Sequence, residues 1–353
     1  MNVPQNLVRW ATITDVARAA GASRSTTSRA LSGQGYVSPE VRDRVRKAAK
    51  RLGYVPDAMA RGLKQRTSRT MGLLVSDLRN PFYAEMAAGA SRTAKELGFS
   101  IMLEDTGGRP VDELVAAADF LAQRVAGVIV TPVSAAITEY LSSHGIPSVE
   151  VDRTFSGRRT DSVTVSNADG VHEATEHLLG LGHSRIALII DETDWTTGQQ
   201  RIEGYRAALN EAGVTADPDL IVACGWDAEA ARRATEQVLS RSNRPTAVFA
   251  ANNVIAEGAW RAAHLLGLAV PADLSLVAFD DAPWMSMVTP GLTTVAQDAD
   301  ALGATALRQL VDRLQSATAP YRSIVLATRL VVRDSTAAPT PVAGLTRWPG
   351  TVV

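Results

Sequence analysis

The first candidate for a functional segment in this sequence is a short stretch rich in hydroxyl side chains and arginine. Residues 23–31 read Ser-Arg-Ser-Thr-Thr-Ser-Arg-Ala-Leu, so only the last two are apolar. A helix of this composition would pack poorly in a core, and arginine and hydroxyls are the partners of guanine edges and phosphates. The segment favours a DNA-reading helix over the alternative, a helical hairpin with an exposed polar face. We expect Arg24, Ser25 and Arg29 to read bases, and Ser23, Thr26 and Ser28 to meet phosphates.

A second group of polar residues follows apolar runs of the kind that form buried strands. Open α/β sheets bind ligands beyond the carboxyl ends of their strands, so these places predict a binding site. Carboxylates, asparagine and arginine bond hydroxyls while aromatic rings stack on apolar ring faces, a combination suited to sugars. The alternative for each polar residue is a helix N-cap or a surface loop contact. The candidates are Asp77, Phe82, Tyr83, Asp152, Arg153, Asn252, Asn253, Asp280 and Asp281.

Signatures of enzymes are weak in this sequence. His172 and His177 resemble a zincin pair, but they are five residues apart instead of four, which puts the imidazoles on different helix faces. No Gly-x-Ser-x-Gly elbow, P-loop or Gly-x-Gly-x-x-Gly occurs. The single cysteine, Cys224, has no disulfide partner and no assigned base, which fits a reducing, cytoplasmic compartment. We expect no catalytic residue, metal or cofactor, and keep an α/β enzyme with a DNA-binding head as the alternative class.

Charge separates the chain into two parts. Of the 353 residues, the first 70 hold 14 Lys or Arg and 4 acids, a net charge of +10, whereas the rest carries −11. A basic part of this size suits a module that neutralises phosphates, because electrostatics dominates affinity for nucleic acids. The plain alternative is a solvated basic surface. A nucleoid-type architectural binder is a third class, but it leaves the large acidic part unexplained.

Local signals predict the helices that position the hydroxyl-rich segment. Thr12-Ile13-Thr14-Asp15 is a capping box, and Gly21 supplies the positive φ that ends the first helix. Ser23 is a good N-cap for the second helix. Ser38-Pro39-Glu40 opens a third helix, which Gly53 stops. Two short helices joined by a three-residue turn that contains glycine make a helix-turn-helix.

The acidic part alternates short apolar runs with segments of helical period, which predicts an α/β domain with parallel sheets. A TIM barrel and two doubly wound lobes both satisfy this pattern. The runs are too short to span a membrane, and residues 1–10 lack the pattern of a secretion signal. Residues 335–353 lack any period, and we expect a loose tail there. Expected strands lie at 71–75, 100–103, 127–131, 148–151, 186–190, 247–250 and 274–279, and expected helices at 82–97, 202–212 and 256–266.

Four stretches of the basic part form one pattern, and they are Thr12–Ala17, Gly21–Ser23, Thr26–Ser32 and Leu52–Leu63. This pattern is similar to the DNA-binding head and hinge of the LacI/GalR family of bacterial repressors. The resemblance implies a homodimer on a pseudo-palindromic operator in double-stranded DNA. It also implies hinge helices in the minor groove, with Leu63 wedged into a central base step. Asp57 departs from the asparagine that the family often has. Further DNA-binding positions implied by the resemblance are Thr12, Ser38 and Ala60.

The same resemblance continues to about Pro339, through motifs such as Asn80–Glu85 and Thr289–Val295. It implies two lobes of a periplasmic-binding-protein-like fold with a small-molecule cleft between them. The effector is expected to be a sugar, an inducer rather than a co-repressor, and Arg201 and Trp226 join the candidates of the cleft. The absence of a heptad-bearing tail favours a dimer over a tetramer. We expect a helix-turn-helix at 1–56, a hinge at 57–69, one lobe at 70–166 plus 297–326, the other at 167–296 plus 327–338, and a flexible tail at 339–353.

Overall fold

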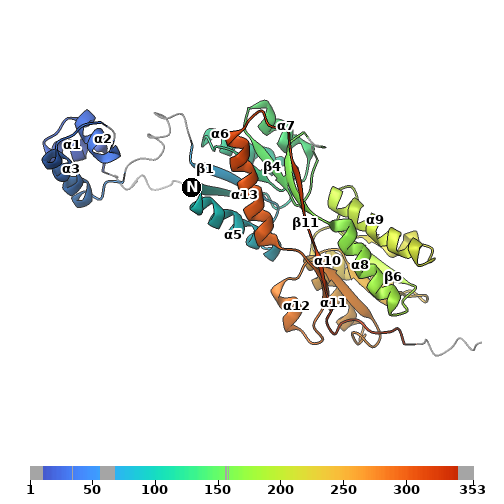
Figure 1. Cartoon of the computed structure of the whole chain (residues 1–353). Coiled ribbons are helices and arrows are strands. Elements are labelled where there is room, and N and C mark those ends of the chain that lie inside the picture. Colours follow the sequence, from blue (N-terminus) through green and yellow to red (C-terminus); the bar gives the residue numbers. More distant parts are fainter. Residues whose placement is uncertain (1–10, 34, 56–67, 156, 158, 341–353) are drawn as a thin grey trace, which may run out of the picture. The chain divides into compact units, whose positions relative to one another are not determined.

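The computed structural model describes residues 11–33, 35–55, 68–155, 157 and 159–340 (Figure 1). Contacts divide the chain after Ser68 into two compact units, which we call the head and the body and describe separately. Most of the predicted hinge, with Ala60 and Leu63, lies outside the described residues. None of the described helices is both long and apolar enough to cross a membrane.

Three helices form the described part of the head, and local signals fix their ends. The side chain of Thr12 accepts a hydrogen bond from the backbone N–H of Asp15, whose carboxylate accepts one from the backbone N–H of Thr12. The predicted capping box is therefore confirmed. Gly21 ends the first helix in the left-handed conformation that favours glycine. The helices are α1 (Ile13–Ala20), α2 (Arg24–Ser32) and α3 (Pro39–Arg51).

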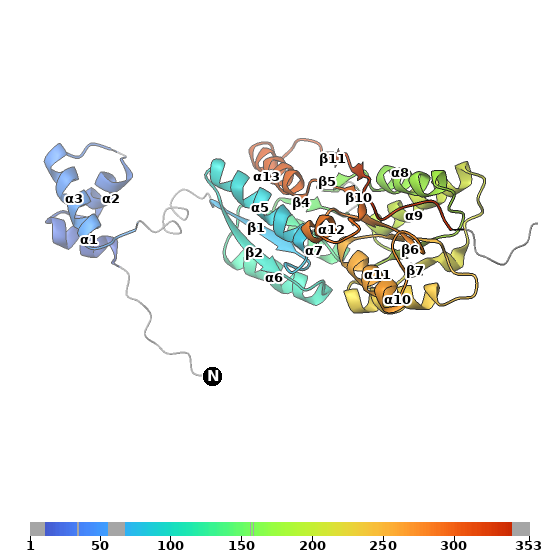
Figure 2. The same cartoon turned by 90° about the horizontal axis from the view of Figure 1, so that it is seen from below.

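Half of the body, which we call lobe A, is a parallel sheet with helices on both faces (Figures 1 and 2). Its strands run in the order β11-β5-β4-β3-β1-β2. Because side chains alternate along a strand, Leu73 packs in the core under α5 and α13, whereas Leu74 packs against Phe120 of α6. The strands are β1 (Thr70–Val75), β2 (Ser100–Asp105), β3 (Val128–Val130), β4 (Ser148–Val151), β5 (Asp161–Val165) and β11 (Ser323–Leu326), and the helices are α5 (Pro81–Glu96), α6 (Pro110–Ala122), α7 (Ala135–Ser143) and α13 (Ala299–Gln315).

The other half of the body, lobe B, has a second sheet in the order β12-β10-β9-β8-β6-β7. All neighbours in it are parallel except the edge strand β12, which runs antiparallel to β10. Helices α8 and α9 pack together, as do α10 and α11, on opposite faces of this sheet (Figure 2). The strands are β6 (Ile186–Ile190), β7 (Ile221–Ala223), β8 (Ala247–Ala250), β9 (Ser275–Phe279), β10 (Thr293–Ala296) and β12 (Arg329–Val331), and the helices are α8 (Asn167–Gly180), α9 (Thr196–Glu211), η1 (Pro218–Leu220), α10 (Ala228–Leu239), α11 (Asn253–Leu265) and α12 (Pro283–Met287).

The chain passes between the two lobes after β5, after β10 and after β11. Two of these crossings are tied to each other. The backbone N–H of Thr328 donates to the hydroxyl of Ser166 at 3.2 Å, and the hydroxyl of Thr328 donates to the carbonyl of Ser166 at 3.3 Å. The crossings after β5 and after β11 are therefore held to each other by hydrogen bonds.

The predicted fold class is confirmed, and two separate sheets exclude the TIM barrel. Strands β5, β7, β10, β11 and β12 were not among the expected strands. The prediction of a loose tail from Ser335 onward is wrong for its first residues. The buried Ser335 hydroxyl donates to the Leu276 carbonyl at 2.6 Å and accepts from the Thr293 backbone N–H at 2.8 Å. The local composition of the tail gives no sign of these hydrogen bonds, because their partners are far away in the sequence.

Candidate functional site

Helix α2 of the head presents its arginines outward. Arg24, Ser25 and Arg29 are exposed, while Thr27 and Ala30 are fully buried and hold the helix against its neighbours. Within the described residues, the Arg24 side chain makes no hydrogen bond or ion pair, and the Arg29 Nε makes only a 3.4 Å bond to the carbonyl of Ser25. Both guanidiniums are thus available to an external partner such as a guanine edge.

The predicted hydroxyl contacts lie at or near helix N-termini. Thr12, Ser23 and Ser38 each accept a hydrogen bond from a backbone N–H in the first turn of the helix that follows. Thr26 and Ser28 are half-buried on α2. A helix N-terminus is an anion-binding place because its free N–H groups and its dipole both favour negative charge. A capping role is therefore compatible with a phosphate contact at these residues.

Positive charge dominates the exposed surface of the head. The described ion pairs within it join Arg18 to Asp15 at 3.6 Å and Lys47 to Asp43 at 2.8 Å, both between neighbouring turns of a helix. Local pairs of this kind neutralise little of the net charge. The other exposed basic residues of the described head are Arg24, Arg29, Arg44, Arg46, Lys50 and Arg51.

In the body, side chains of the two lobes meet beyond the carboxyl ends of the strands, at what we call the interlobe site. Asn253 of lobe B donates through its Nδ2 to the Oδ1 of Asn80 in lobe A at 2.9 Å. Gly108 of lobe A lies against the ring of Trp226 in lobe B, so closely that a Cβ at Gly108 would collide with the ring. The two lobes are therefore in direct contact here.

Arg153 is the centre of the lobe A side. The residue is 3% exposed, and its guanidinium lies over the Trp195 ring of lobe B, with the central carbon 4.1 Å from the ring centroid. Four hydrogen bonds use most of its donors. They go to the Pro132 carbonyl (2.6 Å), the Tyr83 hydroxyl (3.1 Å), the Asp152 Oδ2 (3.2 Å) and the Ser76 hydroxyl (2.5 Å).

Asp152 is buried beside Arg153 and has a left-handed backbone, with φ of 71°. Non-glycine residues pay for this conformation, and such strain is concentrated at functional sites. Burial raises the pKa of the Asp152 carboxyl, and the nearby carboxylates of Asp280 and Asp191 add to the increase, while Arg153 and Arg201 oppose it. Burial also raises the pKa of the Tyr83 hydroxyl to about 12, so Tyr83 stays neutral.

Arg201 of α9 is the main cation on the lobe B side. It is 4% exposed, donates from Nε to the Asn167 Oδ1 at 2.9 Å and from a terminal nitrogen to the Ala251 carbonyl at 2.5 Å. Its guanidinium stacks over the Phe279 ring at 4.0 Å. Arg201 is therefore a structural tie between α8, α9 and the ends of β8 and β9 as well as a candidate for ligand binding.

Asp280 follows β9 and also has a left-handed backbone, with φ of 70°. Its Oδ2 accepts from the backbone N–H (3.0 Å) and the Nδ2 (2.8 Å) of Asn253, and its Oδ1 accepts from the Nε2 of Gln297 (2.5 Å). Neutral donors hold this carboxylate, so its negative charge is not cancelled. The Oε1 of Gln297 is buried and accepts no hydrogen bond from any residue that the structure describes.

Asn252 serves as the N-cap of α11, because its Oδ1 accepts from the backbone N–H of Ile255 at 2.8 Å. Its Nδ2 donates to the Oδ2 of Asp191 at 3.1 Å. The other carboxylate oxygen of Asp191, Oδ1, is buried and without a donor in the described part of the chain. Beside it, the Trp226 Nε1 donates to the Glu192 Oε1 at 2.9 Å.

The structure brings most of the predicted effector residues together, but not all of them. Asp77 turns away to Arg79 of its own loop, whose hydrogen bond lowers the pKa of the Asp77 carboxyl. Phe82 is buried edge-on against Tyr83, with ring centroids 5.0 Å apart. Asp281 instead pairs with Arg333, which follows β12.

Three participants were missed from the sequence. Asp191 directly follows β6, so the strand-end rule that selected the other residues would have found it. Trp195 lies in the loop before α9 and Gln297 in a crossing between the lobes, where no strand-end pattern points to them. Only the packing of one lobe on the other brings these two side chains into the site.

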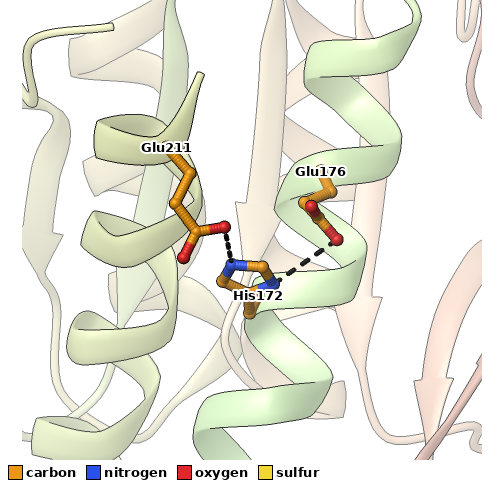
Figure 3. Close-up of side chains that lie close together, drawn as sticks. All are labelled: His172, Glu176 and Glu211. Carbon is orange, nitrogen blue, oxygen red and sulfur yellow. Dashed lines mark hydrogen bonds and ion pairs between the residues drawn. The ribbon is translucent and has the colours of Figure 1, made fainter. Parts of the chain in front are cut away.

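His172, whose spacing from His177 does not fit a zinc-binding pair, meets two carboxylates (Figure 3). Its Nε2 lies 3.0 Å from Glu211 of α9 and its Nδ1 lies 3.4 Å from Glu176 of its own helix α8. Each ring nitrogen faces a different carboxylate, which is the arrangement of a bridge between two helices. Cys224 is also unsuited to nucleophilic chemistry, because burial and nearby acids raise the pKa of its thiol to about 12.

Comparisons with known proteins agree with this division into head and body. The family model described as "Bacterial regulatory proteins, lacI family" matches residues 12–57, and that described as "Periplasmic binding protein-like domain" matches residues 175–336. The ribose operon repressor of Haemophilus influenzae is 32% identical over 92% of this chain and 98% of its own length. The transcriptional regulator DegA of Bacillus subtilis is 35% identical over the same shares.

Solved structures give the same result. The lac repressor dimer bound to operator and the anti-inducer ONPF has a TM-score of 0.82 and 30% identity, and the match covers 94% of this chain and 100% of that one. The complex of the transcriptional regulator CelR with cellobiose has a TM-score of 0.71 and 31% identity, over 92% and 99% of the two chains. These relatives are regulators and not enzymes, so the alternative of an α/β enzyme is set aside.

Proposed function

The chain belongs to the lacI family of bacterial regulatory proteins, and from this premise we propose that it represses transcription as a homodimer on a pseudo-palindromic operator, under the control of a sugar bound at the interlobe site. One observation carries the proposal. The arginines of α2 are exposed and open to DNA, whereas the polar residues of the interlobe site are buried where two lobes meet. The molecule thus has separate places for DNA and for a small ligand, as a ligand-controlled regulator needs.

The proposed DNA contacts combine the described head with residues outside the described part. Arg24, Ser25 and Arg29 would read bases, since an arginine fork matches a guanine edge. Leu63, which lies outside the described residues, would wedge a base step at the operator centre. The remaining proposed contacts, mostly to phosphates, are Thr12, Ser23, Thr26, Ser28, Ser38 and Ala60.

The proposed effector site is the interlobe site. Asp152, Arg201 and Asp280 are the residues that we expect to bind the sugar most directly, because carboxylate and guanidinium groups bond hydroxyls in pairs. The two lobes, 70–166 with 297–326 and 167–296 with 327–338, would change their angle on binding. The sugar-bound structures of relatives, with cellobiose and with ribose, support a carbohydrate effector. The other proposed residues are Asp77, Phe82, Tyr83, Arg153, Trp226 and Asn252.

Exposed apolar side chains on the body support the homodimer. Val111 and Val115 of α6 are 74% and 57% exposed, and Met287 at the end of α12 is 73% exposed. Val111 and Val115 are one turn apart on α6, and an apolar stripe of this kind that faces water suits a surface that a partner covers. A second copy is the partner we propose, since a dimer doubles the contacts with a two-fold symmetric site.

Selection of binding sites from random DNA, followed by calorimetry with a carbohydrate panel, tests the proposal. We expect an enriched motif with inverted symmetry, and a sugar that weakens operator binding. Linkage requires that such a sugar binds the operator complex more weakly by the same factor. A motif without symmetry would contradict the dimer, and binding independent of sequence would favour the architectural class instead.

A further inference from the structure

The interlobe site holds two buried acceptor atoms that lack donors. They are the Oδ1 of Asp191 and the Oε1 of Gln297. A buried polar atom without a partner costs free energy, so native proteins seldom leave one unless a ligand supplies what is missing. Both atoms can only accept, and a ligand that satisfies them must bring hydroxyl or amino donors.

Asp191 and Gln297 belong to one electrostatic neighbourhood. Gln297 bonds Asp280, and Asp280 and Asp191 both act on the buried carboxyl of Asp152. Asp191 also acts on Arg153. Hydrogen bonds also link the two acceptors to adjacent residues, because Asp280, which Gln297 bonds, accepts from the backbone N–H of Asn253, and Asp191 accepts from the side chain of Asn252. Both acceptors therefore lie near the N-terminus of α11.

The balance of charge in this neighbourhood is negative. Asp152, Asp191 and Asp280 contribute three carboxylates, and Arg153 and Arg201 contribute two guanidiniums. Both cations are already engaged within the protein, Arg153 by four hydrogen bonds and Arg201 by two hydrogen bonds and an aromatic ring. An incoming phosphate or carboxylate would meet three carboxylates against two guanidiniums, of which only Arg201 keeps several N–H donors that no described group uses. This balance disfavours a buried anion.

Resting on the function proposed above, we infer that the interlobe site selects an unphosphorylated, uncharged carbohydrate, which donates hydroxyl hydrogen bonds to Asp191 and Gln297, and that it rejects phosphorylated and carboxylated sugars. Asp191 is then a specificity-determining residue. It provides an acceptor for a hydroxyl and repels an anion at the same place.

Matched sugars test this selectivity in the full-length protein. Glucose against glucose 6-phosphate and gluconate, ribose against ribose 5-phosphate, and cellobiose serve as probes, with calorimetry as the readout. Wherever a neutral sugar binds, we expect its charged partner to bind at least about tenfold weaker, because like charges juxtaposed at an interface oppose association. A charged member that binds as tightly as its neutral partner, or more tightly, would overturn the inference.

Inorganic phosphate separates this inference from the proposed function. We expect phosphate to leave the melting temperature of the body unchanged in the wild type. Stabilisation by phosphate that disappears in Arg201→Ala would show an anion site and overturn the inference, even if a sugar effector exists. If instead no sugar of any charge binds, the sugar effector of the proposed function fails, and the phosphate experiment still decides the question of charge.

Two variants assign the selectivity to Asp191. Asp191→Asn keeps an oxygen for the bond from Asn252 but removes the charge, and we expect it to weaken neutral sugars and to reduce the discrimination against sugar phosphates by about tenfold. Asp194→Asn is the matched control, because it removes the same charge from an exposed position of the same loop. Equal discrimination in both variants would contradict the role of Asp191. Gln297→Met, which loses the second acceptor, is expected to weaken neutral sugars without changing the discrimination.

Discussion

The head and the body place their polar functional residues in opposite ways. In the head, Arg24 and Arg29 point into solvent, and the helix caps bond within a few residues of themselves. In the body, Arg153 bonds Tyr83, 70 residues away, and Asn253 bonds Asn80, 173 residues away. We infer that the exposed DNA-contacting residues of the head can be substituted without a loss of folding stability. The residues of the interlobe site, in contrast, also stabilise the fold of the body.

The largest expected effect is on folding of the body. Arg313 and Asp161 form an ion pair at 2.7 Å whose side chains are 7% and 0% exposed. Arg313→Leu leaves the buried carboxylate without its cation, and we expect a loss of about 3 to 5 kcal/mol in the free energy of unfolding, followed by tryptophan fluorescence in urea.

Arg322→Leu is the control, because it breaks an exposed pair with Asp312 at 2.9 Å and is expected to cost less than about 1 kcal/mol. Specific DNA binding by the head should stay intact in both variants in the absence of urea. A similar cost for the two variants would mean that burial does not decide the strength of these pairs.

Arg201→Ala tests the double role of the interlobe residues. We expect it to abolish the response to ligand, with a loss of about 1.5 to 3 kcal/mol in ligand binding by calorimetry, and also to lower the melting temperature. Operator affinity without ligand should be unchanged, and Asp280→Ala should act likewise. Arg206→Ala, on an exposed position of the same helix, is the control. Full ligand affinity in Arg201→Ala would remove Arg201 from the site.

Arg29→Ala tests the opposite behaviour in the head. We expect operator affinity to fall by about 1 to 3 kcal/mol and the preference for one base in each half-site to relax, with no change in melting temperature. Arg46→Ala, which removes an exposed arginine from α3, is the control variant. If Arg29→Ala weakens random and specific DNA equally, then Arg29 contacts a phosphate and not a base.

The smallest expected effect is that of acidification on the stability of the body, which contains all five histidines. Burial lowers the pKa of His183 below the ordinary 6.5, and also that of His177. The unfolded chain therefore binds more protons, so His183 contributes stability that is present above pH 6.5 and is lost as the pH falls below it.

Urea unfolding followed at pH 7.5 and at lower pH measures this dependence. We expect His183→Gln to reduce the slope of body stability against pH, and His144→Gln, at an exposed position, to leave it unchanged. The head has no histidine, so no histidine of the head contributes to a pH dependence of DNA binding. An unchanged slope in His183→Gln would show that other groups control the pH dependence.

The parts that the sequence predicts well are those set by neighbours in the chain. The caps at Thr12, Ser23 and Ser38 follow from patterns of four residues, and the structure has each helix starting where they place it. Asp152 and Asp280 were found because the end of a buried strand is visible as a run of apolar residues.

What the sequence left open depends on contacts between distant segments. The strand β7 is three residues long and only partly buried, so it has no clear pattern. Helix α11 decides which of two neighbouring asparagines bridges the lobes, since its N-cap uses the Oδ1 of Asn252, whose Nδ2 bonds Asp191 of the same lobe, and Asn253 bonds Asn80 of the other lobe. Composition cannot distinguish the two residues.

Strand β1 gives the chain its shortest covalent route from the interlobe site to the head. It begins at Thr70, two residues after the head ends at Ser68, and it ends next to Ser76, whose hydroxyl accepts from Arg153. Six extended residues span roughly 20 Å, and hydrogen bonds to β2 and β3 on both sides make them stiff along their length. A strand held in this way behaves as a stiff element, so a displacement of Ser76 at its ligand end would move Thr70 at its other end as well.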